Sequence, residues 1–112
     1  MDIPNREKII RLIREAIQHI LALGRQDELA LLPVFKDTLT VFDVAPYNRS
    51  SRLLLLSAAN QHITKAEKKT VSTIIGDLDF SINEMSHLVR IRLICAELVN
   101  LINQGLEEVR SR

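Results

Sequence analysis

The chain has 112 residues, of which 46% are apolar and 26% are charged. This composition is typical of a folded protein with one core, so we expect a single domain over residues 1–112 and exclude wholesale disorder. The aromatic residues are three Phe and one Tyr, without Trp, which argues against base-stacking platforms for single-stranded nucleic acid and against aromatic carbohydrate sites.

The formal net charge of +1 is unevenly distributed, because residues 46–70 carry five basic side chains and one acidic one. The single cysteine, Cys95, cannot form an intramolecular disulfide and lies in an apolar stretch. We therefore expect a buried thiol and a cytoplasmic, reducing location. Charged residues interrupt the apolar run at 9–23, so we predict neither a membrane span nor a signal-peptide core there.

The first helix is expected to begin after Asp2 or Asn5 and to end at Gly24. Its apolar residues recur at helical spacing, with charged residues on the opposite side, which is typical of an amphipathic surface helix. The predicted inner stripe consists of Ile9, Ile13, Ile17 and Ile20.

A second helix is predicted to begin at Asp27, as its cap, and to end near residue 44. Pro33 complicates this prediction, because an interior proline loses a hydrogen bond and clashes with the preceding turn. The alternative is a helix that begins near Leu32, with residues 27–31 forming a separate turn. Pro46 then breaks the chain.

Two further helices are predicted between residues 50 and 76. The first covers residues 50–62, and its run of four leucines places it centrally in a bundle. The second begins at Thr64, because Thr-Lys-Ala-Glu at 64–67 has the pattern of a capping box, in which a hydroxyl and a Glu side chain bind free N–H groups. The expected buried residues of this second helix are Val71, Ile74, Ile75 and Leu78.

A long C-terminal helix is predicted from Ser81, where Ser-Ile-Asn-Glu forms another capping box. At ~1.5 Å per residue it would run roughly 45 Å, so it should either form the spine of a bundle or project toward a partner. One helix running from residue 64 to 110 with a kink at Gly76 is the alternative. The predicted fold is all-α, a bundle of four or five helices with a long C-terminal helix.

This last helix has two apolar stripes separated by well over 90° at ~100° per residue. The first consists of Leu88, Ile91, Cys95, Leu98, Val99, Ile102, Leu106 and Val109. Because packing on the bundle covers one face, we expect the second stripe to be covered by the preceding helix or by another polypeptide. That second stripe consists of Ile82, Met85, Val89, Leu93 and Ala96.

Arg92 lies between these stripes, and two roles are open for it. It can pair with a carboxylate across an interface, because a planar guanidinium tolerates burial better than an ammonium. It can also lay its stem over apolar surface and keep its head in water, which is the commoner arrangement. In the interaction hypothesis, Arg90 and Arg92 orient a partner that docks on the second stripe.

No pattern of catalytic or metal-binding residues is present. His19, His62 and His87 fall in different predicted helices or at their ends, without a His or Cys three or four residues away, so we predict no zinc site. The sequence has no glycine-rich phosphate loop and no nucleophile elbow. We predict no catalytic residue, no metal and no cofactor.

The sequence therefore predicts a non-enzymatic protein–protein interaction module, either an adaptor, a regulatory or an assembly factor, acting as a homodimer or on another protein. The alternative is a small DNA-binding regulator with a helix-turn-helix over residues 64–92. Its phosphate contacts would be Arg49, Arg52, Lys65, Lys68 and Lys69. Few basic side chains on the recognition face, and weak overall basicity, make this alternative less favoured.

Overall fold

The computed structural model describes residues 6–44 and 49–110, and the side chains of residues 6–42 and 50–104. These ranges contain helices and no strand. The predicted all-α bundle with a long C-terminal helix is thus confirmed. Its elements are α1 (Arg6–Leu23), the single-turn α2 (Gln26–Leu29), α3 (Leu32–Val44), α4 (Arg49–Ile74) and α5 (Ile82–Arg110).

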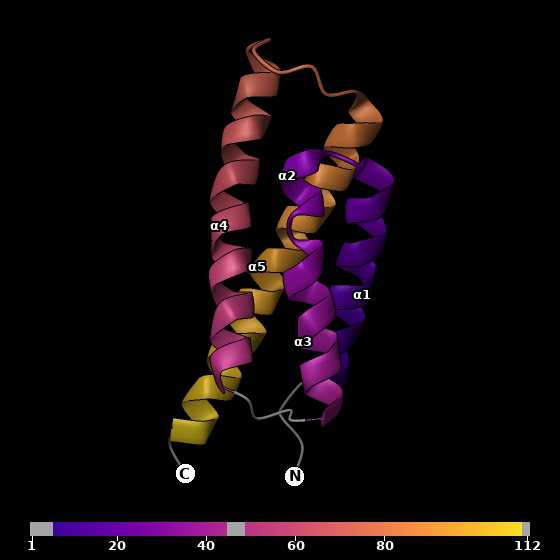
Figure 1. Cartoon of the computed structure of the whole chain (residues 1–112). Helices are drawn as coiled ribbons and strands as arrows, with labels where there is room; N and C mark the ends of the chain where they lie inside the picture. The colour runs from indigo at the N-terminus through magenta and orange to yellow at the C-terminus, as the bar shows by residue number, and fades with distance from the viewer. Residues whose placement is uncertain (1–5, 45–48, 111–112) are drawn as a thin grey trace.

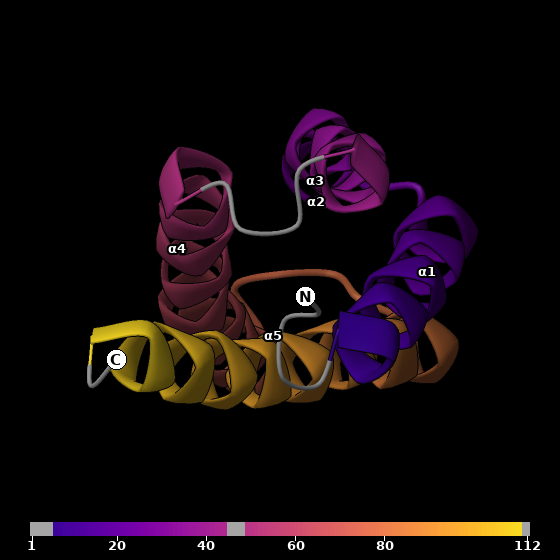
Figure 2. The ribbon, with the colours of Figure 1, turned by 90° about the horizontal axis from the view of Figure 1, so that it is seen from below.

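The four longer helices run alternately up and down the bundle (Figure 1). Seen from below, α1 and α4 lie on either side along α5, and α3 lies opposite α5, between α1 and α4 (Figure 2). The molecule measures 50 × 23 × 19 Å, so the 29 residues of α5, at ~1.5 Å each, run most of its length. Of the two expected roles for the long helix, α5 takes the role of the spine.

The end of α1 follows the sequence prediction, whereas the predicted caps Asp2 and Asn5 lie outside the described residues. Ile9, Ile13 and Ile20 are buried, and Ile17 is half-buried. Gly24 has a φ of +69°, and its N–H donates to the carbonyl of Ile20 at 2.9 Å, which closes the helix. Glycine adopts this left-handed conformation without steric cost.

The alternative start at Leu32 is correct for α3. Pro33 lies in the first turn of α3, where a missing N–H costs nothing. The separate turn before it is α2, which begins at Gln26 with Arg25 in the cap position, so the prediction that Asp27 caps a long helix is wrong. Asp27 instead binds Lys69 on α4.

α4 is one helix where two were predicted. The Thr64 hydroxyl donates to the carbonyl of Asn60 at 3.4 Å, one turn back, and caps nothing. No glycine or proline interrupts residues 49–74, and the buried face passes through Ala59, His62 and Ala66 without a break. A capping pattern stabilises only a free helix end, so here continuous packing decides the outcome.

The second capping box is real and begins α5. The Glu84 N–H donates to the Ser81 hydroxyl, and the Ser81 N–H donates to the Glu84 carboxylate, both at 3.1 Å. Arg25 donates to the same carboxylate at 2.7 Å. The Arg25 hydrogen bond, followed by those from Ser81, lowers the pKa of Glu84 to about 2. Gly76, with a φ of +88°, turns the chain before this cap.

The two capping patterns permit a matched comparison. Ser81→Ala should lower the free energy of unfolding by about 1 kcal/mol, because an orphan N–H loses its acceptor. Thr64→Ala should leave it unchanged or raise it by a few tenths of a kcal/mol, because alanine is the better residue inside an exposed helix segment. Urea unfolding followed by circular dichroism measures both, and equal losses would contradict the assignment of the two sites.

The core is aliphatic apart from Phe35 and Phe42, and α5 supplies its largest share. Burial raises the pKa of the Cys95 thiol to about 12, as expected for a cysteine that acts as a small hydrophobic residue. The predicted inner stripe of α5 is buried at Leu88, Ile91, Cys95, Leu98 and Ile102. Two further members of that stripe, Leu106 and Val109, lie outside the described side chains.

Among the described residues, no helix is both long enough and apolar enough to span a bilayer.

Candidate interaction surface

The outer side of the α4–α5 pair exposes aliphatic side chains to solvent. Ile82 is 92% exposed, Ile74 78%, Val71 58% and Leu93 47%. Met85, Val89 and Ala96 lie on the same side of α5 at helical spacing and are half-buried. We call this set the hairpin surface: Val71, Ile74, Ile82, Met85, Val89, Leu93 and Ala96.

A shallow hollow of about 310 Å³ lies between the two helices within this surface. Glu67, Thr70 and Val71 from α4 line one wall, and Val89 and Arg92 from α5 line the other. The second apolar stripe predicted on α5 is therefore extended by side chains of α4. Contiguous exposed apolar surface of this kind is typical of protein interaction sites.

The contribution of α4 was not predicted, because Val71, Ile74, Ile75 and Leu78 were expected to be buried. That expectation is wrong, and all four are exposed. In Figure 1 the last turns of α4 rise beyond the end of α1. Val71 borders only an open hollow beside Val89 of α5, and Leu78 borders an open pocket beside Gln26 and Asp27 of α2. The sequence shows four aliphatic residues near the end of this helix, but it does not show whether the neighbouring helices extend far enough to cover them.

The two predicted arginines lie on different sides of α5. The Arg92 Nη1 atom lies 3.8 Å from the Glu67 Oε1 atom across the hollow, and the two side chains are 32% and 62% exposed. Arg90 points to α1, where it donates to Glu15 Oε1 at 2.9 and 3.1 Å. Arg92 thus lies beside the hairpin surface, at the hollow between Val71 and Val89, whereas Arg90 joins two helices of the bundle.

The predicted phosphate-binding residues do not form one exposed patch. Lys65 and Lys68 are exposed, but Arg52 is only 2% exposed, and the side chain of Arg49 is outside the described part of the chain. Lys69 is bound by two carboxylates.

The connection between α4 and α5 is longer than the turn of a helix-turn-helix. Seven residues, 75–81, join the two helices, which fold back along each other, whereas a helix-turn-helix has a turn of about three to four residues.

Lys69 is part of a polar cluster, buried at Glu28, that the sequence did not indicate. It binds Asp27 at 2.8 Å and Glu28 at 2.7 Å, and Glu28 is only 1% exposed. Burial pulls the pKa of Lys69 down, but these hydrogen bonds outweigh it, so the pKa lies above its ordinary value. This cluster fastens α2 to α4.

His62 lies beside this cluster and is 3% exposed. It borders an open pocket of about 190 Å³ that is also lined by Glu28 and Lys65. Burial, followed by the charges of Lys69 and Lys65, lowers the pKa of His62 to about 4. The imidazole is therefore neutral near pH 7.

The other two histidines, His19 and His87, meet between α1 and α5. The Nδ1 atoms of His19 and His87 lie 2.9 Å apart, and their ring centroids are 5.2 Å apart. Burial, followed by the neighbouring His87, lowers the pKa of His19. The pair is a contact between α1 and α5. In the described ranges, no three His, Cys, Asp or Glu residues are grouped to hold a metal ion.

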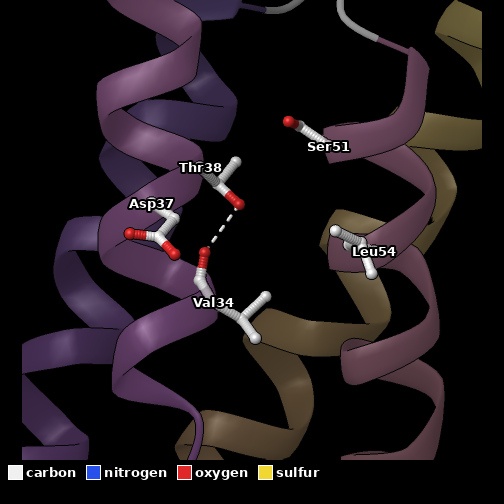
Figure 3. A pocket seen from close by; sticks show the side chains of 5 residues that line it. All are labelled: Val34, Asp37, Thr38, Ser51 and Leu54. Atoms are coloured by element: carbon white, nitrogen blue, oxygen red, sulfur yellow. Dashed lines mark hydrogen bonds between the residues drawn. The ribbon is translucent and has the colours of Figure 1, made fainter.

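The hollow between α3 and α4 is smaller, at about 70 Å³ (Figure 3). Val34, Asp37 and Thr38 line it from α3, and Ser51 and Leu54 line it from α4. The Thr38 hydroxyl donates to the Val34 carbonyl at 2.8 Å, within its own helix.

The chain matches no protein-family model, no curated protein and no solved structure. Its function is therefore inferred from its own surface.

Proposed function

We propose that this protein is a non-enzymatic interaction module, an adaptor, regulatory or assembly factor that binds another helical surface through the hairpin surface. The observation that carries the proposal is the exposure of Val71, Ile74, Ile82 and Leu93 on adjacent helices. Burying apolar area contributes about 25 cal/mol per Å² before the entropic cost of association. Such a surface therefore stabilises a complex with a partner of matching shape.

The physical form of the site also supports binding. Helices present side chains on a rigid backbone, so little order is lost when a partner docks. The hollow at Val71 and Val89 can receive a protruding side chain of the partner. The charges of Glu67 and Arg92 at its rim can fix the partner's orientation. An apolar centre with a charged rim is the usual anatomy of a protein interface.

Leu93→Glu tests the proposal, with Leu21→Glu as its matched control. Leu93 is 47% exposed on the hairpin surface, and Leu21 is 56% exposed on α1. We expect Leu93→Glu to weaken association by at least about tenfold, because a charge replaces a leucine that binding would bury. Leu21→Glu should have no effect. Sedimentation velocity at micromolar concentrations measures self-association, and circular dichroism confirms the fold of each variant.

The same pair of variants covers binding to a different protein. Each variant is immobilised, and the proteins retained from a cell extract are compared with those retained by the unmodified chain. If the unmodified chain is monomeric and Leu93→Glu retains the same proteins as the unmodified chain, the proposal is wrong.

Nucleic-acid binding remains the second hypothesis and has less support, because Arg52 is buried and Lys69 is engaged by carboxylates. If it operates, duplex DNA should bind at low salt, with an affinity that falls steeply as salt rises. Lys65→Ala with Lys68→Ala should then weaken binding and reduce that salt dependence. Absence of binding at low salt would exclude it.

A further inference from the structure

We propose that the occupant of the hairpin surface is a second copy of this chain, related by a two-fold axis, with Arg92 of each copy bound to Glu67 of the other. This inference rests on the proposed function and specifies its partner. It commits to a symmetric dimer in which the α4–α5 pairs of two copies pack together.

Charge complementarity supports a second copy. The hollow has an anion on its α4 wall, Glu67, and a cation on its α5 wall, Arg92. In a two-fold interface each contact occurs twice, with the roles of the two copies exchanged. Because the two charges lie 3.8 Å apart in one copy, a two-fold axis beside them can bring each charge to the opposite charge of the other copy, so the surface is complementary to itself.

The looseness of the Glu67–Arg92 pair supports exchange between copies. Other Lys and Arg ion pairs connect residues 8–28 with α4 or α5, and their N–O distances are 2.7 to 3.1 Å. The N–O distance of the Glu67–Arg92 pair is longer, at 3.8 Å. Within the described residues, the Arg92 guanidinium has no other acceptor, although it offers five N–H donors. A carboxylate from a second copy can bind it in the planar, two-bonded geometry that arginine favours.

Packing is compatible with the same arrangement. Two helical pairs that meet face to face form a four-helix bundle, in which side chains interdigitate and the helices cross at shallow angles. Ile82 and Ile74, the two most exposed aliphatic residues of the hairpin surface, then pass from water into an interface. The small side chain of Ala96 lets helices approach closely at the other end of the surface.

Charge reversal tests the exchange directly. Glu67→Arg places two cations opposite each other in a symmetric dimer, and Arg92→Glu places two anions opposite each other. Each variant alone should dimerise at least about tenfold more weakly than the unmodified chain, since like charges face each other twice. An equimolar mixture of the two should regain dimers, because both contacts become opposite in sign when one chain of each kind pairs.

The mixture separates contacts between copies from contacts within one copy. Within each variant chain the Glu67–Arg92 pair is equally disrupted, so recovery on mixing cannot come from repair of that pair. Native mass spectrometry of one isotope-labelled variant with the other, unlabelled one identifies the heterodimer by mass. Circular dichroism confirms that each variant folds.

Three results overturn the inference. One is an unmodified chain that stays monomeric at micromolar concentration. Another is dimerisation that neither charge reversal weakens. The third is a mixture that forms no heterodimer. If Leu93→Glu still abolishes binding to a different protein, or still dissociates a dimer that the charge reversals leave intact, the proposed function stands and only this arrangement fails.

Discussion

Lys69→Met is expected to lower the free energy of unfolding by about 3 to 5 kcal/mol, because it leaves the Glu28 carboxylate buried without its cation. Glu28 is 1% exposed and binds Lys69 at 2.7 Å, whereas Asp27, the second partner, is well exposed and remains solvated. A domain of this size is stable by only about 5–15 kcal/mol, so the loss is large. Urea unfolding near pH 7 measures it.

Two companion variants give this prediction its control. Glu28→Gln keeps the shape and an acceptor, and Lys69 retains Asp27, so the loss should be clearly smaller than for Lys69→Met. The double variant Glu28→Leu, Lys69→Met removes both charges and should regain most of the stability, since a buried ion pair contributes little relative to apolar residues of similar volume. If Lys69→Met proves neutral, the ion pair does not hold α2 on α4.

Acidification from pH 6.5 to 4 is expected to destabilise the protein by up to about 3 kcal/mol through His62 alone. The pKa of His62 is lowered from 6.5 to about 4 in the folded state by burial and by Lys69 and Lys65. Between these two pH values the unfolded chain binds a proton that the folded chain does not. Stability is therefore unaffected above pH 6.5 and falls as the pH drops toward 4.

His62→Gln isolates this effect, because glutamine does not titrate. The free energy of unfolding of this variant, measured by urea unfolding across the same pH range, should depend less steeply on pH than that of the unmodified chain. Part of the slope should remain, because the pKa of His19 is also lowered. The Glu84 carboxylate, with a pKa of about 2, loses its contribution only below about pH 4.5. Identical slopes for the two proteins would contradict the neutral, buried state of His62.

Only the α5 part of the hairpin surface was predicted from the sequence. The stripe Ile82, Met85, Val89, Leu93 and Ala96 follows from helical periodicity, which is a property of one segment. Val71 and Ile74 have the same periodicity on α4, but whether such residues are core or surface depends on how far the neighbouring helices reach. How far those helices extend along α4 depends on how separate segments pack, so the periodicity of one segment cannot predict it.

The polar contacts show the same division between local and distant information. The Ser81–Glu84 cap lies within four residues and was predicted correctly. His19 and His87 are 68 residues apart, and Lys69 is 41 residues from Glu28, so nothing in their sequence spacing indicated these pairs. The Thr64 pattern failed for a related reason, because a cap matters only where packing leaves a helix end free.

The amino-acid order by itself determined the helical class, the aliphatic core, the end of α1 at Gly24 and the beginning of α5 at Ser81. Each depends on composition or on residues within about one helical turn. Only the tertiary structure decided that α4 is continuous, that Lys69 and Arg52 are withdrawn from solvent, and that Val71 and Ile74 join α5 in one exposed surface. Those outcomes depend on which distant segments meet, because burial is set by the neighbours that a residue gains on folding.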